Sequence, residues 1–399
     1  MNFHSALKQF FNRNKERLND DSVAICIGNE ACDVDSFISS LVTAIHQGLI
    51  HVICMSKEVF MAKGDVATVL DYFKINPDDL IYLEKPSGAL DLKERKINTN
   101  FNIYSGNNLL KSFKIKDKKI NLSIVDHNEP IEELEDAEID LIIDHHELTQ
   151  KSLRAKKIYL DTAVGSCSTL VSKYIGSSFS KKSSITNKFF VEDDYNKMIA
   201  RMLLVPIILD TSNFKRRTSH FDIDEFTRLL KYADIKRKEM RKLRKSIRRN
   251  RRNDKDLKDD LIMLKDYKLY HHRKFNFGCA TVKYSFKDWA DRFEKGNLTN
   301  GNKIKTFDDY LEDFRIKNGL DFLFVNHKQG KHRYFIMKNC PFENFLVEKF
   351  NFKKKTYKTL KYYEIPVEFS RKISMPMVIN AIDKFYKTED EFILRVDDL

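Results

Sequence analysis

The fold is decided by residues 23–36, which read Val23-Ala24-Ile25-Cys26-Ile27-Gly28-Asn29-Glu30-Ala31-Cys32-Asp33-Val34-Asp35-Ser36. The first five residues form a continuous apolar run, as expected for a strand that is buried on both faces. From Ser36 to Gln47, apolar residues recur at helical spacing. Asp33 and Asp35 therefore lie between a buried strand and a helix, which is the usual ligand-binding edge of an open α/β sheet.

The same alternation continues through the first half of the chain. Strand-like patterns cover Ile50–Met55, 121–125 and 141–143, and a helix-like pattern covers Val66–Phe73. Strands that alternate with helices predict an α/β domain with a parallel sheet and helices on both faces. Lys85–Lys119 shows little periodicity, so we expect this segment to be an excursion that lies outside the core.

The composition changes in the middle of the chain. Between Lys236 and Arg252 there are eleven Lys or Arg residues and one acid, with few apolar residues, which favours a helical connector between domains. We expect a first domain over 1–230, this connector over 231–259 and a second, smaller α+β domain over 260–399. The second domain is predicted from three strand-like and three helix-like patterns, which are Phe275–Tyr284, Leu320–Val325, Tyr334–Met337, Phe307–Phe314, Phe342–Phe350 and Met375–Phe385.

The bulk composition limits the compartment and the kind of partner. Lys and Arg exceed Asp and Glu by 71 to 58, and the formal net charge of +13 favours polyanionic partners. The 6 cysteines form no C-x-x-C pair, so we expect a reducing compartment without disulfides or a zinc site. No apolar stretch approaches the roughly 20 residues that span a bilayer. We expect a cytoplasmic protein, and a mitochondrial leader in Met1–Asp21 is the alternative.

Acids and histidines follow later apolar runs, as they do in the first motif. Asp126 and Asp144 each come just past the end of such a run, and His145 and His146 follow directly on the second. Carboxylates and imidazoles at one sheet edge can hold divalent cations. Adjacent histidines point in different directions, so one can bind a metal while the other donates a hydrogen bond to substrate. For the first motif, the alternative is a turn followed by a helix N-cap.

A fourth carboxylate, Asp210, ends a strongly apolar, helix-like segment. Small polar residues follow it, and then come three consecutive cations, Lys215, Arg216 and Arg217. An acid for a metal followed by hydroxyl groups, an amide and cations suits a site that faces a chain of phosphates. The alternative is an ordinary solvated surface.

Together these motifs resemble the DHH phosphoesterase superfamily, in the branch with a DHHA2-type second domain. Family II inorganic pyrophosphatases share this plan, but their first motif begins with a histidine ligand where this chain has Asn29. The form of residues 28–36 is similar to that of fungal cytosolic exopolyphosphatases and prune-type proteins, and the chain length is closer to the former. The resemblance covers nearly the whole chain apart from Lys85–Lys119 and the basic connector. It rests on Asp33-x-Asp35, Asp126-His127-Asn128, Asp144-His145-His146, Val164-Gly165-Ser166-Cys167-Ser168, Asp210, Asp266-Tyr267-Lys268 and Ser370-Arg371-Lys372-x-x-x-Pro376.

The resemblance implies a role for each of these sets of residues. The metal ligands would be Asp33, Asp35, Asp126, His145 and Asp210, with Asn29 in the place of the pyrophosphatase histidine. The catalytic group would be His146, Asp126 and Asn128. The substrate would contact His146, Lys215, Arg216, Arg217, Arg371 and Lys372. The cofactors would be two divalent cations, Mg²⁺ or Mn²⁺ with Co²⁺ as a further candidate, and a neutral amide oxygen favours Mg²⁺.

We therefore expect an exopolyphosphatase that removes the terminal orthophosphate of linear inorganic polyphosphate by in-line attack of a metal-activated water. The alternatives are a prune-like or pyrophosphatase-like hydrolase of short phosphate chains or nucleotides, and a non-catalytic binding protein on the same fold. The expected partner is polyphosphate, with a monomeric chain and no stable nucleic-acid partner. The basic connector is open to three interpretations, which are a solvated helix, a track for a polyanion, and a contact with RNA or an acidic membrane.

Overall fold

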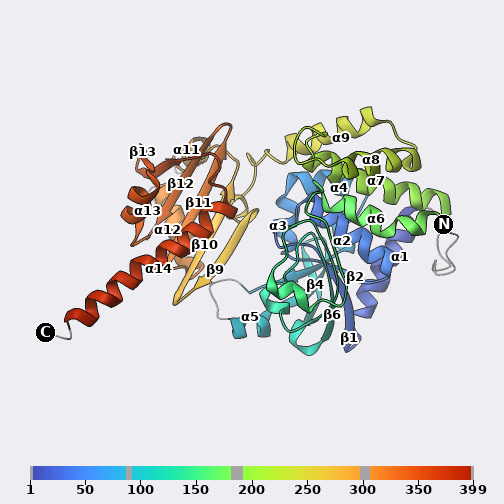
Figure 1. Cartoon of the computed structure of the whole chain (residues 1–399), viewed down its shortest axis with the longest axis horizontal. Coiled ribbons are helices and arrows are strands. Elements are labelled where there is room, and N and C mark those ends of the chain that lie inside the picture. Colours follow the sequence, from blue (N-terminus) through green and yellow to red (C-terminus); the bar gives the residue numbers. More distant parts are fainter. Residues whose placement is uncertain (1–2, 87–91, 181–191, 297–305, 397–399) are drawn as a thin grey trace. The chain divides into compact units, whose positions relative to one another are not determined.

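The computed structural model describes residues 3–86, 92–180, 192–296 and 306–396, and the chain forms two compact units. The first unit comprises the described residues up to Arg251, and the second begins at Arg252 (Figure 1). Each unit has its own sheet and its own hydrophobic core. Within the described ranges, no helix is long and apolar enough to cross a membrane.

A mostly parallel sheet forms the centre of the first unit. Its strands lie in the order β5-β4-β3-β2-β1-β6-β7-β8, and all pairs are parallel except those of β3 with β4 and β4 with β5. Runs of consecutive buried residues in β1, β6 and β7 show that both faces of the sheet are covered, which confirms the predicted α/β class. The strands are β1 Ser22–Ile27, β2 Ile50–Ile53, β3 Ile81–Glu84, β4 Asn100–Ser105, β5 Asn108–Lys114, β6 Lys119–Val125, β7 Glu138–Asp144 and β8 Ile158–Leu160.

Helices pack around this sheet in more than one layer. α2 packs against β1, β2 and β6, and the apolar α7 packs on α2 and is contacted by α8 and α9 in turn. α7 is buried from Ile199 to Ile208 apart from Arg201, which explains the strongly apolar sequence of this part. The α-helices are α1 Phe3–Arg17, α2 Val34–Gln47, α3 Lys57–Ala62, α4 Gly64–Phe73, α5 Leu92–Asn98, α6 Cys167–Ser180, α7 Glu192–Asp210, α8 His220–Ala233 and α9 Arg237–Asn250. Short 3₁₀ helices cover Pro77–Asp79, Ile115–Asp117, Glu132–Leu134 and Gln150–Arg154.

The prediction that Lys85–Lys119 lies outside the core was wrong. β4 lies in this segment and pairs with β3, and its Phe101 and Ile103 enter the hydrophobic core. β5 next to it is mostly exposed. Two apolar side chains at a spacing of two residues form too short a pattern to distinguish a strand from a loop, so the sequence alone did not reveal these strands.

The basic segment is a helix of the first unit rather than a connector between two units. α9 packs on α4 and α7, and its buried residues Met240 and Ile247 lie two turns apart on one side of the helix. Near the start of α4, a Cβ added to Gly64 would lie 2.2 Å from the carbonyl oxygen of Asn250, so the two backbones are in close contact. Of the segment expected to be a connector, 231–259, the part up to Arg251 thus belongs to the first unit. Few apolar residues made this packing hard to predict.

The second unit is built on a mixed sheet with helices packed on both faces. Its strands lie in the order β13-β14-β12-β11-β10-β9, and only β10 and β11 pair in parallel. Alternate residues of β11 enter two separate cores, with Leu323 and Val325 in one and Phe322 and Phe324 in the other. The predicted α+β class is confirmed. The strands are β9 Tyr267–His272, β10 Phe275–Val282, β11 Phe322–Gln329, β12 His332–Lys338, β13 Lys353–Tyr357 and β14 Leu360–Ile365.

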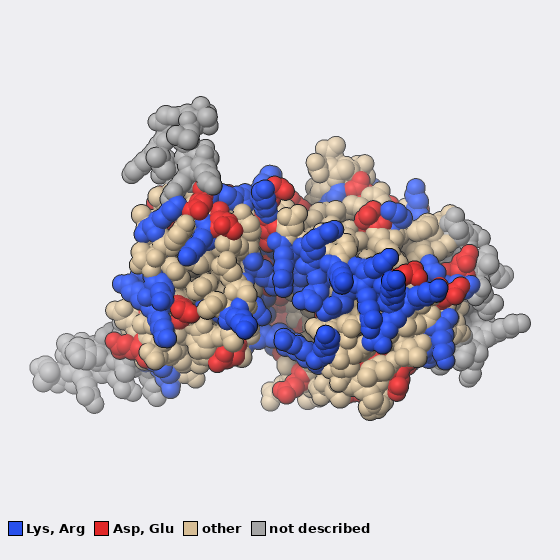
Figure 2. All heavy atoms as spheres, turned by 90° about the horizontal axis from the view of Figure 1, so that it is seen from above, with Lys and Arg blue, Asp and Glu red and all other residues tan. Residues whose placement is uncertain are grey.

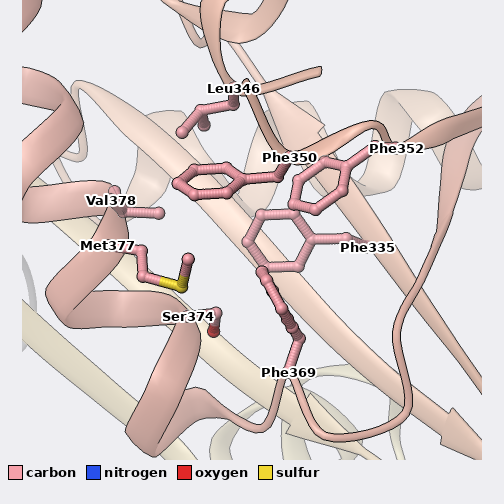
Figure 3. A pocket seen from close by; sticks show the side chains of 8 residues that line it. All are labelled: Phe335, Leu346, Phe350, Phe352, Phe369, Ser374, Met377 and Val378. Carbon is pink, nitrogen blue, oxygen red and sulfur yellow. The ribbon is translucent and has the colours of Figure 1, made fainter. Parts of the chain in front are cut away.

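An apolar hollow lies on one side of this second sheet, beside α13 and α14. Figure 3 shows the side chains that line it, among which only Ser374 carries a polar group. A hollow without a charged side chain does not suit a phosphate group. The helices of the second unit are α10 Asp259–Leu264, α11 Phe286–Gly296, α12 Phe307–Lys317, α13 Glu343–Phe350 and α14 Arg371–Val396.

The close contact between α4 and α9 can be tested with Gly64→Ala. Its Cβ would overlap a backbone oxygen, so we expect a loss of about 1–3 kcal/mol in the free energy of unfolding. Gly176→Ala in α6 is the matched control, because its Cβ would have only one neighbour, at the ordinary distance of 3.6 Å. The control should be neutral or more stable by about 0.5–1 kcal/mol. Chemical denaturation measures both variants, and equal stability of the two would contradict the packing of α9 described above.

Candidate metal centre

Three neighbouring parallel strands of the first unit end beside one another. β1, β6 and β7 are adjacent in the sheet, so the residues just past their carboxyl ends meet at one edge. Asn29 follows β1, Asp126 follows β6, and Asp144 ends β7. One ligand atom from Asp126, one from Asp144 and one from each of His145 and His146 all lie within 4.8 Å of one another, which is a cluster that could hold a metal ion.

Asp126 is the buried acid that joins the three strand ends. Its φ of 66° is left-handed, a conformation that is uncommon for a residue with a side chain and clusters at functional sites. Its backbone N–H donates to the carbonyl oxygen of Ile143 at 2.9 Å, which holds the turn against β7. Its Oδ2 accepts a hydrogen bond from Asn29 Nδ2 at 2.8 Å, and its Oδ1 lies 3.3 Å from His145 Nε2. The carboxylate is therefore turned toward both neighbouring motifs.

His145 is oriented in the way that a metal-binding histidine requires. Its Nδ1 lies 3.1 Å from the carbonyl oxygen of Val164. Because a carbonyl oxygen can only accept, Nδ1 carries the proton, and in the neutral ring Nε2 keeps its lone pair on the side of Asp126. A carbonyl on the far nitrogen is a common support for an imidazole that binds metal.

Asp144 supports the other side chains of the cluster. Its Oδ1 accepts hydrogen bonds from His145 N and His146 Nδ1, both at 2.8 Å, and its Oδ2 accepts one from Asn128 Nδ2 at 2.7 Å. Burial would raise the pKa of Asp144, but the hydrogen bond and charge of His146 and the hydrogen bond from Asn128 hold this pKa below its usual value. Asp144 thus orients His146, whose side chain is 40% exposed.

Asn128 lies behind this carboxylate rather than at the surface of the site. The side chain is buried, with Nδ2 on Asp144 and Oδ1 accepting from Ser152 Oγ at 2.8 Å. In this arrangement Asn128 can act on His146 only through Asp144. Its place in the catalytic group stays a prediction.

Asp35 is engaged in a structural task. Its Oδ1 accepts hydrogen bonds from Ser39 Oγ and Ser168 N, both at 3.0 Å. Its Oδ2 accepts from Ser166 Oγ at 3.0 Å and from Cys167 N at 2.7 Å. These four hydrogen bonds occupy all four lone-pair positions of the carboxylate. They hold the N-terminus of α6 against α2, and a negative charge is favourable at a helix N-terminus. The predicted role of Asp35 as a metal ligand would have to compete with these bonds.

Asn29 and Asp33 have oxygen atoms that these networks do not use. Asn29 Oδ1 is buried and has no hydrogen-bond partner among the described residues, whereas Nδ2 holds Asp126. Asp33 caps α2 with one oxygen, which accepts from Ser36 N at 3.1 Å. A buried amide oxygen without a partner is costly unless a cation or a water binds it, so the predicted amide ligand at Asn29 fits this structure.

Excess negative charge at this edge fits divalent cations. Burial raises the pKa of Asp126 and of Asp210 well above the usual range, and the nearby charges of Asp35 and Asp33 raise both further. Burial would lower the pKa of His145, but its hydrogen bond to Asp126 and the charge of Asp35 raise it to about 10. The raised pKa values of the two carboxyl groups and of His145 mean that the metal-free cluster retains protons, which a bound cation would replace. Carboxylate, amide and imidazole ligands suit Mg²⁺ or Mn²⁺.

The three predicted cations lie on the loop after α7. Residues 212–214 all have left-handed φ angles, between 51° and 65°, so the chain turns sharply just past Asp210. Lys215, Arg216 and Arg217 are exposed on this loop. A Cβ on Gly165 would lie 1.8 Å from the carbonyl oxygen of Arg217, so the loop backbone is pressed against the segment that holds Asp35.

Arg371 and Lys372 belong to the second unit. Arg371 forms an ion pair with Asp266 at 2.7 Å and also donates to the carbonyl oxygen of the same residue at 2.7 Å, which joins the start of α14 to the start of β9. Lys372 follows it and is exposed. Contact of either residue with a substrate stays a prediction.

Comparisons with known proteins agree with this geometry. Residues 23–207 match the DHH family, N-terminal domain, and residues 245–381 match the DHHA2 domain. The chain belongs to the DHH–DHHA2 family. The resemblance inferred from the motifs is thereby confirmed at the level of both domains, and the closer similarity to fungal exopolyphosphatases stays a prediction.

The solved structures that are similar to this chain are distant in sequence. A putative family II inorganic pyrophosphatase from Methanococcus jannaschii is 16% identical, with a TM-score of 0.56 over 90% of this chain and 99% of that one. An exopolyphosphatase-related protein from Bacteroides fragilis is 13% identical, with a TM-score of 0.34 over 94% of this chain and 96% of that one. The first of these similarities shows a shared fold.

Sequence reasoning missed Asp222, which supports this DHH site from behind. The fully buried carboxylate accepts hydrogen bonds from Gly165 N at 3.0 Å, from Thr169 Oγ1 at 2.6 Å and from Ser219 N at 2.8 Å. It thus fixes the segment whose serines and amides hold Asp35. The spacing Ser219-x-x-Asp222 is that of a capping box, a pattern that could have indicated the start of α8.

The two acids of the first motif should differ in stability effects. Asp33→Asn and Asp35→Asn remove the same charge, but asparagine caps a helix as well as aspartate does, so Asp33→Asn should change the stability of the metal-free protein by less than about 0.5 kcal/mol. Asp35→Asn leaves buried hydrogen-bond donors without an acceptor, so it should lower the free energy of unfolding by about 1–3 kcal/mol. Denaturation in chelator measures both, and equal stability would contradict the structural role of Asp35. Calorimetric titration with Mn²⁺ then shows which variant binds metal more weakly.

The metal-free protein should lose stability as the pH rises above neutral. The folded state raises the pKa of His145 from 6.5 to about 10, so it holds this proton more tightly than the unfolded chain does. The resulting stability is fully present below pH 6.5 and is lost as the pH rises toward about 10. Thermal unfolding in chelator across this range measures the loss. His145→Gln should show a flatter profile, and an unchanged profile would contradict the proposed protonation.

Proposed function

We propose that this chain is an exopolyphosphatase, which hydrolyses the terminal phosphoanhydride bond of linear inorganic polyphosphate and releases orthophosphate. The observation that carries the proposal is the cluster of Asp126, His145 and His146 at the strand ends of the DHH domain. A buried carboxylate between an amide and an imidazole can hold divalent cations, and a partly exposed histidine lies beside it.

Each side chain has a separate task in this chemistry. When bound, divalent cations supply a water of lowered pKa and a clamp for the phosphoryl oxygens. Asp126 and His145 present their ligand atoms to the same space. Asn29 holds Asp126 through Nδ2 and has a neutral oxygen without a partner among the described residues, which could serve as a further ligand. His146, fixed through its Nδ1 by Asp144, is placed to donate a hydrogen bond or a proton to the phosphate group.

The charge beside the site supports a chain of phosphates as the substrate. Lys215, Arg216 and Arg217 follow Asp210 on an exposed loop, where they can neutralise phosphates beyond the terminal one. The formal net charge of +13 favours approach of a polyanion. Asn29 in place of a histidine supports the exopolyphosphatase form of the motif over the pyrophosphatase form.

A chain-length series tests this proposal. We expect orthophosphate release with Mg²⁺ or Mn²⁺ from chains well beyond pyrophosphate, and weaker release from pyrophosphate itself. Asp126→Ala should lower kcat by more than about 100-fold, because even changes next to a metal ligand cost about 10- to 100-fold. Asp117→Ala, which removes an exposed aspartate of the same unit, is the matched control and should leave kcat unchanged.

Three outcomes would count against the proposal. Activity confined to pyrophosphate would favour the pyrophosphatase-like alternative. Absence of hydrolysis with Mg²⁺, Mn²⁺ and Co²⁺, in a protein that still binds polyphosphate, would favour a binding protein. Full turnover by Asp126→Ala would remove this cluster from the reaction.

A further inference from the structure

A strongly basic surface lies along α9 in the first unit. We call it the α9 surface and define it as the eight exposed Lys and Arg residues between Lys236 and Arg249. Figure 2 shows a dense group of basic side chains on the face that carries α9. Within the described residues, none of the eight lies within ion-pair distance of a carboxylate, whereas Arg251 just beyond them pairs with Asp65 at 2.9 Å. The charge of this surface is therefore not neutralised by the unit itself.

The stability of the helix does not explain this charge. Like charges four residues apart destabilise a helix, and α9 contains several such pairs, such as Lys238 with Lys242 and Lys245 with Arg249. Burial lowers the pKa of Arg244, and the nearby charge of Arg248 lowers it further. A partner that brings negative charge would relieve this repulsion.

α9 lies directly beside the loop that leaves the metal centre. Arg241 Nε donates to Asn213 Oδ1 at 3.2 Å, and the guanidinium of Arg237 lies 4.9 Å from the ring centre of Phe214. The α9 surface thus adjoins the loop that follows Asp210.

The chemistry of α9 distinguishes among polyanions. The helix contains no aromatic residue, so it lacks the flat side chains on which the bases of single-stranded RNA stack. Its apolar side, with Met240 and Ile247, is buried within the unit and cannot enter a membrane. A chain of phosphates without bases or lipid requires only cations.

We infer that the α9 surface binds the distal part of linear polyphosphate while the chain end lies at the metal centre. This inference rests on the proposed function and extends it to a second contact with the substrate. Lys238, Lys242, Lys245 and Arg249 are spaced at intervals of three and four residues and form one stripe, about 16 Å long at 1.5 Å per residue. A stripe of that length contacts several consecutive phosphates.

The test replaces the four residues of this stripe by Gln. None of the four makes a hydrogen bond or ion pair within the described part of the chain, so the fold should be kept. The matched control replaces four exposed lysines of the same unit, Lys111, Lys114, Lys116 and Lys119, and changes the net charge equally. The probe is long-chain inorganic polyphosphate with a fluorescent end label, bound in chelator so that no hydrolysis occurs.

At low salt, the stripe variant should bind this probe about 10-fold more weakly or worse. The slope of the logarithm of the binding constant against the logarithm of the salt concentration should be shallower by about 3, because four contacts to a single-stranded polyanion are lost. The control should bind like the unchanged protein. In the presence of metal, the rise in KM should be larger for long chains than for tripolyphosphate.

Equal binding by the stripe variant and the control would overturn the inference. So would a loss of binding that affects an RNA oligonucleotide or anionic lipid vesicles but leaves polyphosphate unchanged. Because binding is measured without turnover, a failure of the proposed hydrolysis appears separately, as absent phosphate release from a protein that still binds through this stripe.

Discussion

The parallel pairing of β1, β6 and β7 is the constraint on which the site depends. Because neighbouring parallel strands end at the same edge, residues about 100 positions apart in the chain lie side by side. Strand pairing alone brings them together. The left-handed turn at Asp126 then directs its carboxylate toward Asn29 on one side and His145 on the other. The strained backbone is held by the hydrogen bond from Asp126 N to β7.

This arrangement brings together buried and half-buried carboxylates, and the surrounding structure compensates for their charges unequally. Asp35 and Asp144 are satisfied by hydrogen bonds from serines, amides and His146, whereas Asp126 and Asp210 have raised pKa values. Asp35 and Asp144 therefore stabilise the fold, whereas the negative charges of Asp126 and Asp210 would be stabilised by a bound cation. The positive charge of Arg251, just past α9, offsets part of the effect on Asp210.

Sequence reasoning succeeded where a strong pattern and the chemistry coincide. Acids placed after buried apolar runs predicted the sheet edge at which Asp126 and His145 lie close together, and the motifs predicted the two family domains. The metal-binding roles stay predictions. Sequence reasoning failed at Lys85–Lys119, where two inward side chains of β4 give too little periodicity, and at α9, where a narrow apolar stripe among many cations concealed a packed helix. In both cases, neighbouring helices and strands bury the apolar side chains of the segment, and the local sequence pattern does not predict these neighbours.

The sequence by itself determined the α/β alternation, the position of each acid after its strand, and the excess of positive charge, because these follow from local spacing and composition. Only the tertiary structure decided what each acid does. Asp35 and Asp33 are two residues apart, yet one accepts four hydrogen bonds and the other caps a single helix. The donors to Asp35 include residues more than 130 positions away, and no spacing rule relates residues that only packing brings together.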